Sequence, residues 1–300
     1  MPLYIRHLPG QPAKLVDDKA IPPNNVLYNP SIAWPILYIR KTEYHQTKQV
    51  NGILLHNMET NKSYTISSPM HLLEKNINTY TGLEDLRICW YKERLWFTAT
   101  CTHASSNMIS ELCVGYFNKE FTKVERMSHV DIGSVPVKNV CPFVVGEELL
   151  LFDIYKSAIY TCTDVYDTTD SVNPTWLKFI ATKIKSLIAA PGLSIDMYRG
   201  STSPVHLHGN TWGVIVHDII FNDHSAPIVQ RLSYLHIWME FDITTGVVTF
   251  VSTPFWLVQW GIEYVSGFMM KNNVVTIFLG INDKAALSFT TTINDLRVGK

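Results

Sequence analysis

Five segments of similar sequence recur along the chain at intervals of roughly 55–65 residues. They cover residues 33–40, 93–100, 147–154, 209–217 and 272–280. Most begin with a polar turn, and all continue as an apolar or aromatic strand, with further short strand patterns between them. A period that holds about four strands is typical of sheets arranged radially around an axis. We therefore expect an all-β protein folded as a five-bladed β-propeller.

The strand count alone also permits a β-sandwich or two stacked β-domains. The even period and the lack of any linker-like stretch favour one propeller domain over residues 1–300. Residues 164–174 are rich in turn formers, which indicates an insertion and not a domain boundary. Convincing helix patterns are nearly absent, and residues 183–190 are the best candidate.

The composition is that of a compact globular protein, with 46% apolar and 17% charged residues. The 8 Trp, 14 Tyr and 13 Phe suit many β-strands and also suit surfaces on which sugars stack. A net charge of −1 without basic runs gives no attraction to nucleic acid, so we expect no such partner. The oligomeric state stays open.

Cysteine usage and hydropathy bear on the compartment. The five cysteines are odd in number and contain no C-x-x-C, so they are expected to be buried free thiols in a reducing compartment. The first residues lack the apolar core of a signal peptide, and no stretch approaches the ~18 apolar residues of a membrane span. We expect a soluble, cytoplasmic protein without a membrane span.

The densest cluster of charge lies in the hexapeptide 82–87, Gly-Leu-Glu-Asp-Leu-Arg, just before a strongly apolar run. Neighbouring side chains of a strand point to opposite faces, so Glu84 and Asp85 are expected to occupy different environments. Different environments separate carboxylate pKa values, as acid catalysis at neutral pH requires. The alternative is a salt-bridged turn that caps a hairpin.

The same hexapeptide resembles the G-x-E-D-x-R signature of five-bladed propeller enzymes that act on β-mannosides. These are the phosphorylases of glycoside hydrolase family 130 and the related β-1,2-mannosyltransferases and phosphorylases of glycosyltransferase family 108. Further segments resemble family motifs in the same order along nearly the whole chain. They are residues 28–32, 138–139, 142–143, 199–201, 252–255, 261–264 and 280–286.

The resemblance implies an active site at the propeller axis and an inverting reaction. Asp85 would be the catalytic residue, which donates a proton in cleavage and accepts one in synthesis. Glu84 and Arg87 would fix its geometry, whereas Asn29 and Asp283 would bind the sugar. A mannosyl unit would pass between a β-mannoside, which is an oligosaccharide or glycan, and phosphate.

Phosphate binding requires cations, because a dianion is otherwise strongly hydrated. Lys138 and Arg199 match family positions for this role, with His217, Tyr234 and His236 as further candidates. The chain departs from the family pattern at two places. Only His103 follows the catalytic turn where a basic residue is common, and Ile237 stands where an arginine would follow His236. The resemblance implies no metal and no organic cofactor, only inorganic phosphate or mannose-1-phosphate as co-substrate.

Two other functions remain open. An inverting glycoside hydrolase would need a second carboxylate to activate water, and Glu263, also a candidate for substrate binding, could be that base. A glycan-binding propeller without catalysis would use aromatic residues at the axis. Three of these candidate residues could instead have a purely structural role. Lys138 would be a solvated turn lysine, Arg199 would stack on an aromatic ring or pair with a nearby aspartate, and Glu263 would bind backbone amides between blades.

Overall fold

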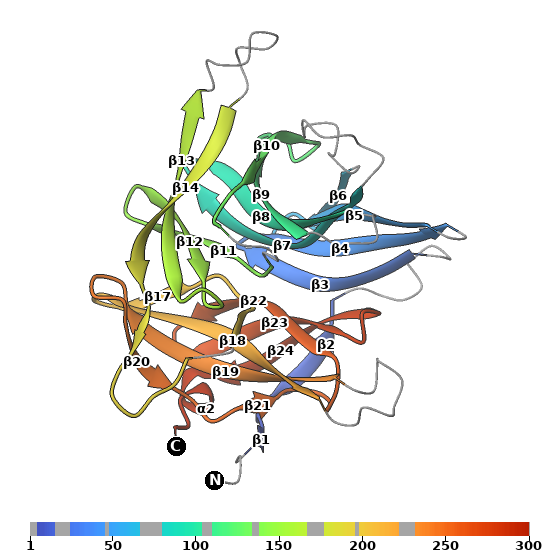
Figure 1. Cartoon of the computed structure of the whole chain (residues 1–300). Coiled ribbons are helices and arrows are strands. Elements are labelled where there is room, and N and C mark those ends of the chain that lie inside the picture. Colours follow the sequence, from blue (N-terminus) through green and yellow to red (C-terminus); the bar gives the residue numbers. More distant parts are fainter. Residues whose placement is uncertain are drawn as a thin grey trace.

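The computed structural model describes residues 5–15, 25–45, 48–66, 80–103, 110–133, 138–166, 177–195, 198–221 and 232–299. Within these ranges the chain is almost entirely β-strand, and the one short helix is α2 (Ile293–Leu296). The strands form several twisted sheets arranged around a common centre (Figure 1). The all-β propeller architecture expected from the repeats is therefore confirmed.

Four of the sheets are four-stranded antiparallel blades. The first contains β3 (Asn25–Ala33), β4 (Ile36–His45), β5 (Lys48–Asn57) and β6 (Lys62–Ile66). The second contains β7 (Tyr80–Tyr91), β8 (Arg94–His103), β9 (Ser110–Phe117) and β10 (Val124–Val130). The third contains β11 (Cys141–Val145), β12 (Glu148–Asp153), β13 (Ala158–Tyr166) and β14 (Leu177–Ser186). The fourth contains β2 (Gln11–Lys14), β22 (Glu263–Lys271), β23 (Val274–Ile281) and β24 (Ala285–Thr292).

The number of blades predicted from the sequence is wrong, because the described residues form four such blades and not five. The remaining strands form one eight-stranded sheet. It contains β1 (Arg6–His7), β15 (Ile188–Ala189), β16 (Arg199–Gly200), β17 (Val205–His208), β18 (Thr211–Phe221), β19 (Leu232–Asp242), β20 (Val247–Val251) and β21 (Phe255–Trp256). Two of its pairings, β1 with β21 and β15 with β20, are parallel and join distant segments. Counting sequence repeats detects only the long strands, and it does not detect short strands that pair with distant segments.

The inner strands meet around the axis. Strand β7 contacts both β3 and β11, strand β3 contacts β22, and β22 contacts β19 of the larger sheet. The N-terminal strand β2 pairs with β24, so a segment from the start of the chain completes the last blade. This pairing protects an edge that would otherwise be open.

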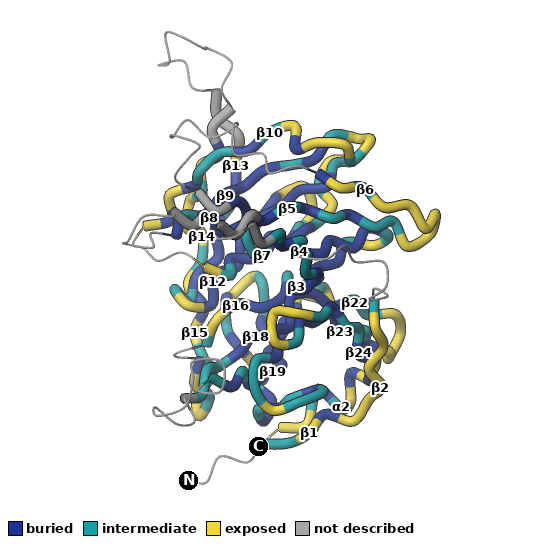
Figure 2. Tube along the Cα trace, turned by 90° about the vertical axis from the view of Figure 1, so that its right-hand side faces the viewer, coloured by how far each residue is buried: buried dark blue, intermediate teal, exposed yellow. Residues whose placement is uncertain are grey.

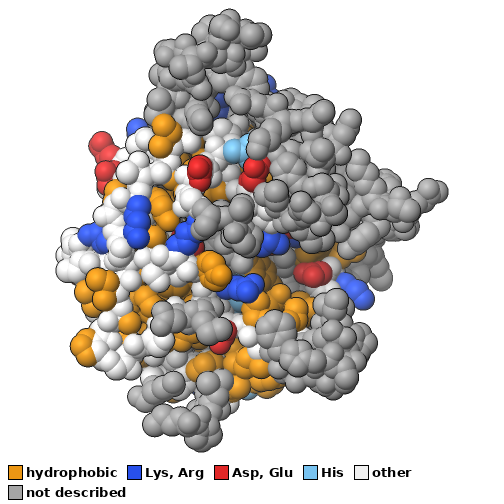
Figure 3. All heavy atoms as spheres, viewed as in Figure 1, with side chains coloured by type: hydrophobic (Ala, Val, Ile, Leu, Met, Phe, Trp, Pro, Cys, Tyr) orange, Lys and Arg blue, Asp and Glu red, His pale blue; other side chains and the backbone are white. Residues whose placement is uncertain are grey.

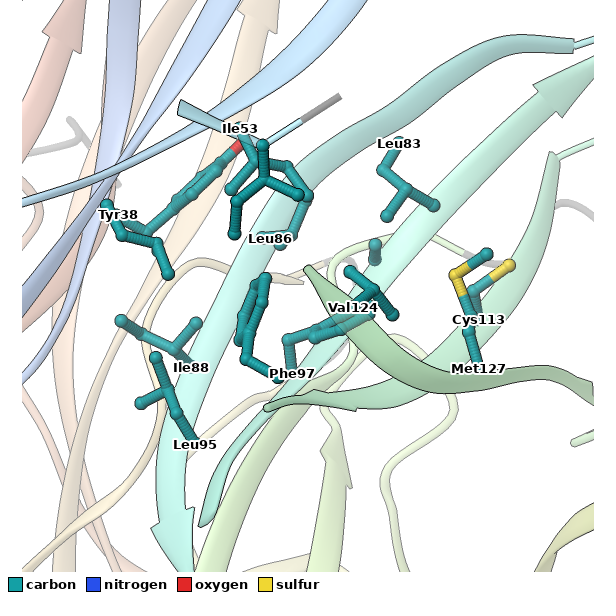
Figure 4. Close-up of a cluster of buried hydrophobic side chains, with 14 of the residues drawn as sticks. Tyr38, Ile53, Leu83, Leu86, Ile88, Leu95, Phe97, Cys113, Val124 and Met127 are labelled. Atoms are coloured by element: carbon teal, nitrogen blue, oxygen red, sulfur yellow. The ribbon is translucent and has the colours of Figure 1, made fainter. Parts of the chain in front are cut away.

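Apolar layers between neighbouring sheets hold the fold together. The trace in Figure 2 is dark blue along the strands and yellow mainly at the turns. Figure 4 shows one such layer, where Tyr38 and Ile53 of the first blade face Leu86, Ile88 and Phe97 of the second. All five side chains are at most 2% exposed, so their apolar surface stabilises the joint between the two blades.

Two further predictions are corrected. Residues 183–190 are not helical, because Lys183, Ile184 and Lys185 alternate polar and apolar with the period of a strand and extend β14 beside β13. Cys101 and Cys113 on the adjacent strands β8 and β9 form a disulfide, whereas Cys89, Cys141 and Cys162 are not part of a disulfide. Cross-strand partners cannot be identified from the spacing of cysteines in the sequence.

Most of the insertion predicted at residues 164–174 lies outside the described residues, as does the side chain of His103. In the described ranges, no helix is both long and apolar enough to cross a membrane. On the face seen in Figure 3, acidic and basic side chains are interspersed and do not gather by sign.

Candidate active site

Asp85 lies at the axis because strand β7 bulges there. The register between β7 and β8 shifts between Glu84 and Arg87, and Asp85 has a φ of 52°. Strand β3 bulges at the corresponding place, where Asn29 has a φ of 49°. The amide Nδ2 of Asn29 donates a hydrogen bond to Oδ1 of Asp85 at 2.9 Å. Bulges re-aim side chains, and here two of them bring the inner strands of two blades to one point.

Two glycines allow this close approach. Gly82, which begins the motif, has a φ of 105°, and a Cβ there would lie 2.8 Å from the carbonyl oxygen of Asn51. A Cβ on Gly280 would overlap the side-chain oxygen of Asn29. Only glycine fits both positions without moving the backbone that carries Asn29 and Asp85.

Arg40 of β4 is the main charged partner of both motif carboxylates. Its Nη1 lies 3.1 Å from Oδ1 of Asp85, and its Nη2 lies 3.5 Å from Oε1 of Glu84. The expectation that the two carboxylates occupy different environments is therefore wrong. Strand alternation fails at a bulge, because a residue with positive φ turns its side chain out of the alternating pattern.

The positive charges around Asp85 hold its pKa below the ordinary value. Burial of the carboxyl acts to raise the pKa, but the charges of Arg40 and Arg87 and the hydrogen bond from Asn29 outweigh it. The side chain keeps 21% of its surface exposed. Asp85 is therefore an ionised carboxylate at neutral pH that still reaches solvent.

Arg87 lies just behind Asp85 and joins four inner segments. It is fully buried, and its guanidinium donates to the carbonyl oxygens of Ser201 at 2.5 Å and Asp85 at 2.8 Å. It also donates to the hydroxyl of Tyr264 at 2.5 Å, and that hydroxyl donates to Oδ1 of Asn139. Arg87 thus fixes the backbone of Asp85, as the motif implies, and does so without pairing with its carboxylate.

Asp283 and Tyr234 face the same centre. Asp283 follows β23 in a turn, with a φ of 53°, and much of its surface is exposed. Surrounding protein atoms desolvate its carboxyl enough to raise the pKa, and the negative charge of Asp85 raises it further. Desolvation, followed by the charges of Asp283 and Asp85, likewise raises the pKa of Tyr234. The two carboxylates and the phenol therefore interact across one site.

The two predicted phosphate-binding cations are both exposed and close to this centre. The charge of Lys138 is among those that lower the pKa of Asp85. Arg199 is opposite His217 in the pairing of β16 and β18, and its charge acts to lower the pKa values of His217 and Tyr234. An anion bound beside Asp85 would therefore have two solvent-accessible cations near it.

The remaining candidates lie deeper. His217 is buried, its Nδ1 is 2.7 Å from the hydroxyl of Ser201, and burial holds its pKa well below the ordinary value. Glu263 is wholly buried and accepts hydrogen bonds from the backbone amides of Leu257, Val258 and Gln259 at 2.7, 2.7 and 3.1 Å. The buried Nε2 of His236 is 3.3 Å from Oε1 of Glu263. These contacts match the structural role considered for Glu263, because its carboxylate already accepts hydrogen bonds from backbone amides.

In the described ranges, no group of three or more His, Cys, Asp or Glu side chains is arranged to hold a metal ion. His206 and His208, which share a strand in the sequence pattern, are both exposed, and Nε2 of His206 is 2.9 Å from the carbonyl oxygen of Gly209.

Sequence reasoning missed Arg40 and Asn51. Arg40 is 6% exposed, and its guanidinium also donates to Oδ1 of Asn51 at 3.1 Å. A signal was present in the sequence, since Arg40 interrupts an apolar strand and a buried arginine needs a negative partner. The roles of Asn139 and Tyr264 were also missed, although both lie in segments that resemble family motifs.

Comparison with known proteins finds the same overall fold in solved structures of low sequence identity. No protein-family model and no curated protein sequence matches the chain. Solved structures do match it. The chain superposes on a β-1,2-mannobiose phosphorylase from Listeria innocua with a TM-score of 0.55 and 11% identity, over 94% of this chain and 95% of the other.

Two structures from Leishmania mexicana are similar to the same extent. One is a mannose phosphorylase in complex with phosphate, with a TM-score of 0.54 and 13% identity over 93% of this chain and 90% of that one. The other is a GDP-mannose-dependent mannosyltransferase, with a TM-score of 0.57 and 10% identity over 92% and 88%. The resemblance read from the sequence motifs is thereby confirmed at the level of the fold.

Proposed function

We propose that this protein is a carbohydrate-active enzyme that transfers a mannosyl unit with inversion between a β-mannoside and phosphate. The observation that carries the proposal is the placement of Asp85. Two bulged inner strands present this carboxylate at the axis, where Asn29 and Arg40 hold it at 2.9 and 3.1 Å and part of it reaches solvent. The likeness in fold to mannoside phosphorylases supports the choice of sugar.

The ionised state of Asp85 fits its use as a proton acceptor in synthesis. An acceptor hydroxyl gives its proton to the carboxylate while its oxygen bonds to the anomeric carbon of mannose-1-phosphate, and phosphate leaves from the opposite face. In the reverse direction the protonated carboxyl returns that proton to the sugar. A carboxylate whose pKa is held low is a weaker base. It is, however, fully ionised at neutral pH, so it is available to accept a proton.

The neighbouring groups have separate tasks in this proposal. Asp283 is at the solvent side of the site and would bind sugar hydroxyls, together with Asn29. Lys138 and Arg199 would bind the phosphate, because they are the exposed cations whose charges reach Asp85 and Tyr234. Arg40 and Arg87 would hold Asp85 in place without contacting the substrate.

The hydrolase alternative has less support from the geometry. An inverting hydrolase needs a carboxylate that is free to activate water. Glu263, the candidate for that role, is fully buried and accepts three backbone hydrogen bonds. Phosphate-dependent transfer needs no such base, so it is the reaction that these residues favour.

Incubation with mannose-1-phosphate and a manno-oligosaccharide tests the proposal. Release of inorganic phosphate and growth of the oligosaccharide by one mannose are expected. Sugar release that does not depend on phosphate would indicate the hydrolase, and binding without turnover would leave only the glycan-binding function.

A further inference from the structure

Trp260 is an exposed aromatic residue next to the candidate active site. It lies between β21 and β22, and 46% of its surface is exposed. The carbonyl oxygens of the two residues that follow it accept hydrogen bonds from the backbone amides of Tyr234 at 3.0 Å and Asn282 at 2.9 Å. Asn282 immediately precedes Asp283. The segment that carries Trp260 is therefore bound to the two segments that carry Tyr234 and Asp283.

The same segment is also held on the other side of Trp260. The buried carboxylate of Glu263 accepts hydrogen bonds from the backbone amides of the three residues just before the tryptophan, which are Leu257, Val258 and Gln259. Hydrogen bonds thus fix the backbone both before and after Trp260. A ligand that packs on the indole does not have to order a loop, so it loses less entropy on binding.

The polar groups on the neighbouring segments have no partner. Among the residues that the structure describes, none makes a hydrogen bond or an ion pair with the hydroxyl of Tyr234 or the carboxylate of Asp283. Tyr234 is half-buried and Asp283 is exposed, so both groups reach solvent. Asp85, in contrast, already has Asn29 and Arg40 as partners. Tyr234 and Asp283 are therefore the groups that can bind hydroxyls of a ligand.

An exposed indole beside an unpaired phenol and an unpaired carboxylate suits a sugar ring. A pyranose presents C–H groups on its faces and hydroxyls around its rim. The C–H groups gain by leaving water against an aromatic ring, whereas the hydroxyls need polar partners. A purely apolar ligand would leave the carboxylate of Asp283 without a partner, and an anion would be repelled by it.

The exposure of these residues indicates which sugar the indole contacts. The side chain of Asp85 keeps 21% of its surface exposed, whereas Trp260 is nearly half exposed. In the reaction proposed above, the new bond forms beside Asp85, so the transferred mannosyl unit lies there. An oligosaccharide acceptor must extend from that point toward solvent, where Trp260 lies.

We propose that a sugar unit of the oligosaccharide acceptor stacks on the indole of Trp260, while Tyr234 and Asp283 bind hydroxyls beside it. Trp260 would thus determine the preference for an oligosaccharide over a single sugar as acceptor. This inference rests on the proposed function of Asp85, because that function defines where the acceptor begins.

Kinetics of mannosyl transfer from mannose-1-phosphate test the role of Trp260. Trp260→Ala should raise the KM for a manno-oligosaccharide acceptor by roughly five- to fiftyfold. It should leave the KM for mannose-1-phosphate and the kcat at saturating acceptor unchanged, because the stacked unit is outside the reacting bond. Trp260→Phe keeps an aromatic face, so its acceptor KM should stay within about threefold of the wild type.

The matched control is Trp34→Ala. Trp34 is 48% exposed, and it lies five residues beyond Asn29 in the turn after β3, roughly 16 Å along the strand direction from the candidate site. This variant should leave both KM values unchanged. Circular dichroism verifies that each variant is folded. An equal rise of the acceptor KM in Trp34→Ala and Trp260→Ala would overturn the proposal.

Isothermal titration of the manno-oligosaccharide without mannose-1-phosphate separates this inference from the proposed function. If the wild type binds the oligosaccharide without turnover, the proposed reaction is wrong, and weaker binding by Trp260→Ala still supports the stacking role. Unchanged binding and kinetics in Trp260→Ala would overturn that role. Weaker binding of GDP with unchanged oligosaccharide binding would also overturn it, since the indole would then stack on a nucleotide base. A wild-type protein that neither binds nor extends the oligosaccharide would contradict both proposals.

Discussion

The guanidinium of Arg40 lies 3.1 Å from the carboxylate of Asp85, although the two residues belong to different blades and are 45 positions apart. Arg40 is almost wholly buried, and its other donors bind Asn51. The contact sets both the position and the protonation of the residue on which the proposed reaction depends.

Arg40→Gln is expected to change the pH dependence of mannosyl transfer. The charge of Arg40 lowers the pKa of Asp85, so its removal raises that pKa. Synthesis needs the ionised carboxylate. The acidic limb of the pH–rate profile for synthesis should therefore move to higher pH in the variant. Profiles of kcat/KM against pH measure this shift. An unchanged acidic limb would show that Asp85 is not the titrating group.

The same variant should be less stable. The folded-state pKa of Asp85 is depressed, so its contribution to stability is present above the ordinary pKa of about 3.9 and is lost as the pH falls through the lowered value. Removal of one partner from a buried pair costs about 3–5 kcal/mol of unfolding free energy at neutral pH. Urea unfolding measures the loss. Arg94→Gln, which breaks the exposed pair with Glu125, is the control and should cost less than about 1 kcal/mol.

Tyr264→Phe is expected to loosen the joint between blades. The variant removes the hydroxyl that accepts from Arg87 and donates to Asn139, so a buried guanidinium loses a partner. The unfolding free energy should fall by about 1–3 kcal/mol. Tyr91→Phe removes a hydroxyl that donates to the carbonyl oxygen of Glu147 at an exposed position, and it should cost much less. Equal losses in the two variants would contradict the role given to Arg87.

Lys138→Ala should raise the KM for phosphate far more than the KM for the sugar. The reason is that Lys138 is an exposed cation whose charge reaches Asp85, where the phosphate would bind. Lys119→Ala removes an exposed lysine that pairs with Glu93 at a surface turn, and it should leave both constants unchanged. If Lys138→Ala changed both KM values equally, Lys138 would not belong to the anion site.

Glu263→Gln separates the structural role from the catalytic one. The amide would turn a donor toward backbone N–H groups that now bind a carboxylate, so the unfolding free energy should fall by about 1–3 kcal/mol. Transfer per folded molecule should stay close to that of the wild type. A selective loss of activity with unchanged stability would restore Glu263 as a catalytic base.

The radial β-architecture could be predicted from the sequence, because the long strands such as β8, β12, β18 and β23 repeat at a regular period. The eight-stranded sheet could not be predicted. Strands as short as β1, β15, β16 and β21 carry no periodic signal, and each exists because a distant segment pairs with it.

The sequence motifs name candidate site residues, but they do not give the geometry that brings these residues together. Asn29, Asp85 and Asp283 could be identified from their motifs, and the structure gives each of them a positive φ at the axis. Arg40 is outside every motif, and its contact with Asp85 depends on the packing of two blades. Bulges explain the error about Glu84 and Asp85, because an alternation rule assumes an uninterrupted strand.

The most direct test of the central claim is phosphate release from mannose-1-phosphate in the presence of a manno-oligosaccharide, compared between the wild type and Asp85→Asn. Asparagine is close in size but cannot accept the proton, so the rate should fall by about 100- to 10,000-fold while the protein stays folded. A folded Asp85→Asn variant that releases phosphate at the wild-type rate would contradict the account.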